Sequence, residues 1–161
     1  MTTTEYLETY LQDHRAGAEF GSDLARRLAD ENPGTPHEDF FVGLAAEIEQ
    51  DVEVLEGIMD RFGVRKAILK TAGAEIGEKL GRLKPNDELT GYSPLSRVLE
   101  LETLRAGVQG KLALWDSLAQ IAPHDERLAA EEIDRLTQRA ERQLEDLREH
   151  HQLAAREAFL I

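Results

Sequence analysis

Cysteine is absent from the 161 residues of the chain. That absence excludes disulfides, zinc sites with thiolate ligands, iron–sulfur clusters and cysteine nucleophiles. No uncharged apolar stretch approaches the length of about 18 residues that a membrane-spanning helix needs. Residues 1–15 also lack the basic start and apolar run of a signal peptide. We therefore expect a cytoplasmic protein that does not associate with a membrane.

Positive charge is scarce as well. The chain has 19 Lys and Arg against 32 Asp and Glu, which gives a net charge of −13. Nucleic acids and anionic membranes attract positively charged surfaces, so neither is an expected partner. Aromatic residues make up 6% of the chain and apolar residues 41%, a mix typical of a helical globular domain. At this length we expect a single domain, residues 1–161.

Apolar residues that recur every three or four positions predict four long helices. The expected helices span residues 4–30, 36–62, 93–121 and 125–158. For the second helix, Thr35 and Glu38 suggest a capping box with Pro36 in the first helical position, and Gly63 suits the end of the helix. The third helix begins with a Ser-Pro pair at 93–94, which is also a strong start signal.

Residues 64–92 interrupt this pattern with glycines and a proline. This segment has six Lys and Arg against four Asp and Glu, a charge of +2 within an acidic chain. Long helices with short first and last turns and one long central connection are typical of a four-helix bundle with a crossover. We therefore predict an all-α fold of two helical hairpins, joined by a crossover over about 64–92 that contains short helical pieces.

This arrangement resembles the ferritin-like superfamily over essentially the whole chain. Three strings, Asp-His-Arg-Ala-Gly-Ala at 13–18, Glu-Lys-Leu-Gly-Arg-Leu-Lys at 78–84 and Gly-Tyr-Ser-Pro-Leu-Ser-Arg at 91–97, are similar to an uncharacterised group of small bacterial ferritin-like proteins. The resemblance implies a fold and no established activity. Metal-binding members of the superfamily use a Glu from two helices and a Glu-x-x-His from the other two. Since no Glu-x-x-His occurs in this sequence, we expect no di-iron centre and no other cofactor.

Four polar residues are expected at similar height in the bundle if helices one and four run parallel to each other, and two and three likewise. They are His14, Asp51, Lys111 and Glu132. One hypothesis is a semi-buried polar cluster in which Asp51 orients His14 and Lys111 stands where a metal ion would, because buried carboxylates must be paired. The alternative is that the charged side chains extend outward and His14 is a core histidine with one hydrogen bond. Glycines at 17 and 21 beside His14 leave either room for a ligand or a close approach of two helices.

A metal site remains a second hypothesis, with iron or another transition metal bound by imidazole and carboxylate groups. Its ligands would be His14, Glu47, Asp51 and Glu132. A weaker candidate combines His37 and His151 with Glu38 or His150 near one end of the bundle, where surface histidines are common.

Two functions follow from these patterns. The first is a non-enzymatic bundle that acts through protein–protein contact as a homodimer, because the apolar end Phe159-Leu160-Ile161 needs something to cover it. The second is a metal- or ligand-binding protein, such as a stress-related oxidase, with a non-standard site of histidine and carboxylates.

Overall fold

The computed structural model describes residues 2–65 and 91–160, and within these ranges the chain is helical and contains no strand. The elements are α1 (Thr3–Glu31), α2 (Glu38–Arg61), α4 (Pro94–Ile121), the 3₁₀ turn η1 (Ala122–His124) and α5 (Ala130–Phe159). The predicted all-α class with four long helices is confirmed. The expected crossover with short helical pieces lies almost entirely outside the described residues.

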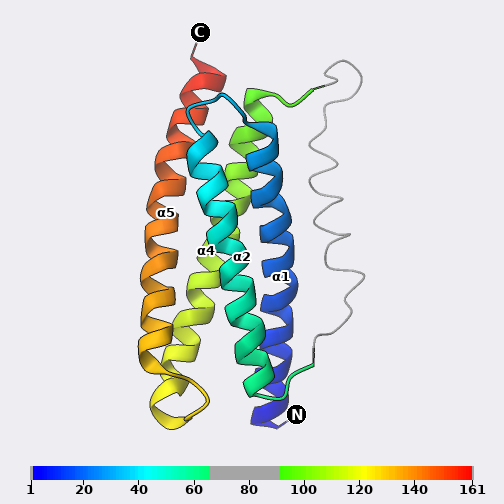
Figure 1. Cartoon of the computed structure of the whole chain (residues 1–161), viewed down its shortest axis with the longest axis vertical. Coiled ribbons are helices and arrows are strands. Elements are labelled where there is room, and N and C mark those ends of the chain that lie inside the picture. Colours follow the sequence, from blue (N-terminus) through cyan, green and yellow to red (C-terminus); the bar gives the residue numbers. More distant parts are fainter. Residues whose placement is uncertain (1, 66–90, 161) are drawn as a thin grey trace.

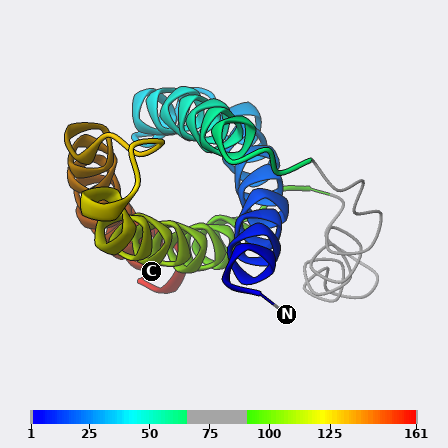
Figure 2. The ribbon, with the colours of Figure 1, turned by 90° about the horizontal axis from the view of Figure 1, so that it is seen from below.

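The four helices lie side by side, with α1 and α5 running in one direction and α2 and α4 in the other (Figure 1). Viewed along their length, they follow one another around a ring in the order α1, α2, α5, α4 (Figure 2). The closest backbone packing joins α1 to α2 and α4 to α5, and α1 also packs against α4. On the remaining side, long side chains connect α2 to α5: Arg61 of α2, for example, donates to Glu132 of α5 at 2.7 Å.

Local signals in the sequence set two of the helix ends as predicted. Ser93 is the N-cap of α4, its hydroxyl accepts a hydrogen bond from the Ser96 backbone N–H at 3.1 Å, and Pro94 occupies the first turn. Gly63 follows α2 with a φ of 70°. A glycine adopts this left-handed conformation without the steric cost that a Cβ atom brings, so it ends the helix.

The start of α2 differs from the prediction, which was wrong about a capping box at Thr35. The N-cap is His37, and its side chain makes no capping hydrogen bond. The Thr35 hydroxyl donates instead to the Asn32 carbonyl oxygen at 2.9 Å, and the Glu38 carboxylate accepts from the Gly34 backbone N–H at 2.7 Å. These two side chains hold the turn before the helix together, so the helix begins two residues later than expected.

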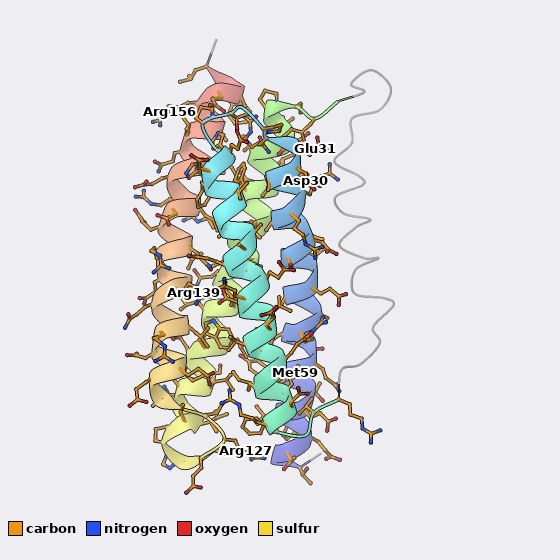
Figure 3. The ribbon with its side chains drawn as sticks, viewed as in Figure 1. Asp30, Glu31, Met59, Arg127, Arg139 and Arg156 are labelled. Carbon is orange, nitrogen blue, oxygen red and sulfur yellow. The ribbon has the colours of Figure 1, made fainter. Side chains whose placement is uncertain are left out.

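The start of α5 is later than predicted by five residues. Pro123 lies in η1, and Asp125 then closes a turn by accepting hydrogen bonds from the backbone and the guanidinium of Arg127. The Arg127 guanidinium also lies 4.0 Å from the centre of the Phe62 ring, which ties this loop to the end of α2 (Figure 3). Residues near 125 are therefore held in a turn, and α5 begins only at Ala130.

All four helices contribute to the hydrophobic core. Its largest fully buried side chains include Trp115, Phe41, Met59, Leu101 and Ile133. On α4 the buried face is wide, because this helix packs against both α1 and α5. No helix in the described ranges is long and apolar enough to cross a membrane.

Candidate functional site

A cavity of about 290 Å³ lies among the middle turns of α1, α2 and α4. Apolar side chains form most of its wall: Ile48, Val52, Leu55, Leu104, Val108, Leu114 and Trp115. Gly17 of α1 and Gly107 of α4 also line it and are exposed, so the cavity reaches the solvent between these two helices. A cavity of about 150 Å³ can hold benzene. The space here therefore suits a molecule of about the size of a fused bicyclic ring.

Four helical glycines line this cavity. They are Gly17 and Gly21 of α1 and Gly107 and Gly110 of α4. A Cβ atom placed on any of them would have no atom within 4 Å, so close helix packing does not explain them. Of the two explanations open from the sequence, the structure favours room over a close approach. A glycine inside a helix lowers the free energy of unfolding by about 0.5–1 kcal/mol relative to alanine. Four of them around one cavity therefore lower the stability of the protein noticeably.

His14 is half-buried and lines the cavity. Its ring meets the Tyr10 ring edge-on, with 4.5 Å between the centres. Among the described residues the imidazole makes no hydrogen bond, so the expected orientation of His14 by Asp51 is not present. Burial lowers the pKa of His14, while the charge of Asp13 acts in the opposite direction. At neutral pH this imidazole is therefore uncharged.

Asp51 and Lys111 form a buried ion pair at the wall of the cavity. Lys111 Nζ donates to Asp51 Oδ2 and to Gln143 Oε1, and Arg139 donates to Asp51 Oδ1 at 3.0 Å, reaching from α5 at mid-height (Figure 3). Gln143 in turn donates to Glu47 at 2.9 Å. Burial lowers the pKa of Lys111, and the charge of Asp51 raises it. We call these five residues the Asp51 network; its polar groups are bonded to one another.

Glu132 lies apart from the Asp51 network, in the ion pair with Arg61. The structure thus brings Asp51 and Lys111 into contact, places His14 on the same cavity without a bond to either, and leaves Glu132 elsewhere. Within residues 2–65 and 91–160, no three His, Asp or Glu side chains gather closely enough to hold a metal ion. The expected metal ligands are therefore not assembled: His14, Glu47, Asp51 and Glu132.

Gln143 and Arg139 are the members of the Asp51 network that the sequence interpretation missed. Both lie in a stretch of α5 that is rich in Glu and Arg. Gln143 is only 2% exposed. Its position was detectable, because it lies three residues after Ala140 and four before Leu147, which puts it on the buried stripe of the helix.

A second polar cluster lies at the end of the bundle where α2 begins. His37 is fully buried, its Nδ1 lies 2.8 Å from Nδ1 of His150, and its Nε2 lies 3.2 Å from the Glu157 carboxylate. Two ring nitrogens at this distance share one proton, since one must donate and the other accept. His151, the partner expected from the sequence, contacts Glu102 at 3.0 Å instead. One residue along α5 turns the side chain by about 100°, which decides which histidine faces His37.

Burial lowers the pKa values of both His37 and His150. For His37, Glu157 raises the pKa and Arg97 lowers it; for His150, the neighbouring His37 lowers the pKa and Asp146 raises it. Both folded-state pKa values lie below that of an unfolded histidine, so the unfolded chain binds more protons as the pH falls. The free energy of unfolding should therefore decrease below about pH 6.5.

Substitution of His150 by phenylalanine is expected to flatten this acid dependence. Between about pH 7 and about pH 5, the variant should lose roughly 1–2 kcal/mol less unfolding free energy than the wild type, because one buried proton site is gone. Urea titrations at several pH values measure the difference. Phe40 stacks on the His150 ring at 3.9 Å, so Phe40→Leu is a control that keeps both histidines and should keep the slope. If the unfolding free energy of His150→Phe and that of the wild type change equally with pH, the prediction is contradicted.

Comparison with known proteins identifies no relative of this chain. No family model matches the chain, and neither the curated proteins nor the solved structures contain a match. In the described part of the chain, the fold and the site define an all-α arrangement of four long helices with a cavity among three of them. The ferritin-like resemblance stays a prediction.

The apolar C-terminal end of α5 is solvent-exposed within the single chain. Phe159 and Leu160 are both exposed, and Leu95, in the first turn of α4 at the same end of the bundle, is exposed too. Self-association through this end, the homodimer expected from the sequence, stays a prediction.

Proposed function

We propose that this protein binds a small, largely apolar molecule in the cavity among α1, α2 and α4 and does not transform it chemically. The observation that carries the proposal is the cavity of about 290 Å³, whose wall includes four helical glycines with open Cβ positions. Concave apolar sites of this size with a few polar groups are typical of small-molecule binding sites. The proposal develops the ligand-binding alternative of the sequence analysis and does not involve a metal.

The ionisable groups around the cavity support binding over catalysis. Asp51 and Lys111 are bonded to each other and to further members of the Asp51 network. Asp13 and His14 are the remaining candidates for an acid or base, and neither has a hydrogen-bonded partner among the described residues that would orient it. General acid–base and nucleophilic catalysis both need an oriented pair of groups near the substrate.

The helix directions support a ferritin-like topology, which we include in the proposal. α1 runs parallel to α5 and α2 runs parallel to α4, as a long connection between the two hairpins requires. The cavity would then occupy the part of the bundle where metal-binding members hold their ions, although here it is lined mainly by apolar groups.

The test is the binding of indane, a bicyclic hydrocarbon of nine carbon atoms, to the full chain. At about −0.5 kcal/mol per non-hydrogen atom, we expect a dissociation constant of about 0.5 mM, measured by ligand-observed NMR. Gly21→Leu should weaken binding at least about tenfold, because the new side chain occupies the cavity. Gly43→Leu is the matched control: Gly43 is also a helical glycine with open space at its Cβ position, but it does not line the cavity. The proposal would be contradicted if the wild type did not bind indane, or if Gly21→Leu and Gly43→Leu lost the same amount of affinity for indane.

A further inference from the structure

Asp13 lies at the rim of the cavity with its carboxylate free. It lines the cavity, it is exposed, and its side chain forms no hydrogen bond or ion pair with any other described residue. Asp13 comes four residues before Gly17 on α1, so the two lie on the same face of the helix, one turn apart. Since the cavity reaches the solvent beside Gly17, the carboxylate of Asp13 is near this opening.

The imidazole of His14 is also available to a ligand. Neither of its ring nitrogens has a partner among the described residues. In that part of the chain, the buried side-chain atoms without a partner belong to Glu100 and Trp115 alone, so both nitrogens of His14 are accessible to solvent. Burial lowers the pKa of His14, so the ring is uncharged at neutral pH and one of its nitrogens is a free acceptor.

The ionisable side chains that line the cavity leave one negative charge uncompensated. They are Asp13, His14, Asp51 and Lys111. Lys111 is paired with Asp51 and His14 is uncharged, so the charge of Asp13 remains. The net charge of −13 adds a field around the whole protein that attracts cations and repels anions. An apolar interior is therefore combined with an opening that favours a positive group.

We propose that the ligand of the cavity is an amphiphilic organic cation, an apolar ring system that carries one protonated amine. The ring system occupies the apolar interior. The ammonium group stays at the opening, where it donates to the Asp13 carboxylate and to the unprotonated nitrogen of His14. It keeps part of its hydration there, which avoids the cost of burying a charge completely. This inference rests on the proposed function and adds the ligand class to it.

The test compares indane, 2-aminoindane and indane-2-carboxylate, which share one ring system and are neutral, cationic and anionic at pH 7. A pair of partly exposed charges changes an affinity by about two- to fivefold. We therefore expect the amine to bind about two- to fivefold more tightly than indane, and at least about fivefold more tightly than the carboxylate. Ligand-observed NMR with the full chain measures all three affinities.

Three variants assign the charge effect to the opening. Asp13→Asn keeps the shape of the side chain and should lower the ratio of amine to carboxylate affinity at least about threefold, without changing the affinity for indane. The matched control is Asp30→Asn, which removes an exposed aspartate near the end of the same helix that does not line the cavity (Figure 3). This residue is roughly 25 Å further along α1, well beyond the Debye length of about 8 Å, so the ratio should be unchanged. Gly21→Leu should weaken binding of the amine as it weakens binding of indane.

The pKa of His14, followed through its ring protons by NMR, gives a second measurement in the wild type. A bound ammonium group beside the imidazole opposes its protonation, so 2-aminoindane should lower the pKa of His14 further. Indane-2-carboxylate should raise this pKa relative to its value with indane. A pKa of His14 that rises when the amine binds would overturn the inference.

The outcomes separate this inference from the proposed function. Equal affinities for the amine and the carboxylate, or equal losses of the ratio in Asp13→Asn and Asp30→Asn, would overturn the inference and leave the proposed function intact. Amine binding that persists in Gly21→Leu would place the cation outside the cavity and would likewise overturn it. If the wild type bound none of the three molecules, both would be overturned.

Discussion

Substitution of Asp51 by alanine is expected to lower the free energy of unfolding by about 3–5 kcal/mol, the usual effect of removing one partner of a buried ion pair. Asp51 is 4% exposed and its two oxygens accept from Lys111 and Arg139. Without it, the Lys111 ammonium remains buried with only the neutral Gln143 oxygen as an acceptor. Urea unfolding followed by circular dichroism measures the loss.

Two comparison variants separate the buried charge from a general loss of contacts. The double variant Asp51→Leu, Lys111→Met removes both charges and should recover most of the lost stability, because apolar replacement of a whole buried pair is often neutral or favourable. Glu132→Ala removes a more exposed ion pair, with Arg61, between α5 and α2, and it should cost no more than about 1 kcal/mol. A loss in the double variant as large as in Asp51→Ala would show that charge burial is not the cause.

The pH dependence of the Asp51→Ala variant should reveal the state of Lys111. Burial already lowers the pKa of Lys111, and the charge of Asp51 opposes this shift in the wild type. With Asp51 gone, the folded-state pKa falls further below that of the unfolded chain, so the unfolded state binds more protons. The stability deficit of the variant should therefore shrink as the pH rises from about 7 to about 10.

Alanine at all four cavity glycines should make the protein more stable and impair ligand binding. Each substitution at 17, 21, 107 and 110 replaces a helical glycine whose Cβ position is open, so each should add about 0.5–1 kcal/mol, or about 2–4 kcal/mol together. A methyl group takes up roughly the volume of a water molecule, about 30 Å³. Four of them would remove a large part of the 290 Å³ cavity, and indane should bind at least about tenfold more weakly.

The matched control for this variant is alanine at Gly43 and Gly57 of α2. Both are helical glycines with open Cβ positions, and neither lines the cavity. This pair should raise the melting temperature without any loss of indane binding. A fourfold variant that is less stable than the wild type would contradict the prediction. So would a fourfold variant that is more stable and binds indane as tightly as the wild type does.

The sequence predicted the helices better than the site, because helix ends depend on neighbouring residues. Ser93 with Pro94 and the glycine at 63 act within one turn, and both predictions are confirmed. The signal at Thr35 is equally local, yet polar side chains such as those of Thr35 and Asp125 can hold a turn as well as cap a helix. In the structure they hold turns, and both helices begin later than predicted.

The contents of the site depend on contacts between helices that no local pattern specifies. Counting residues along the expected helices placed Asp51 and Lys111 at the same height, and the structure shows them bonded. The same count placed Glu132 with them, but Glu132 lies in the first turn of α5 and pairs with Arg61 at the end of α2, while Arg139, further along α5, reaches Asp51. The small residues near His14 indicated open space or close packing, and only coordinates distinguish these two.

The two hairpins, α1 with α2 and α4 with α5, pack more closely on one side of the bundle than on the other, and this difference has a consequence for motion. α1 packs against α4, whereas α2 and α5 are connected by side chains such as Arg139, Arg142 and Arg61. A small rotation of one hairpin about the line of α1 and α4 would stretch these polar bridges and leave the packing inside each hairpin unchanged. Since the cavity has walls from both hairpins, this rotation would change its width, and a guest could enter without the unwinding of any helix.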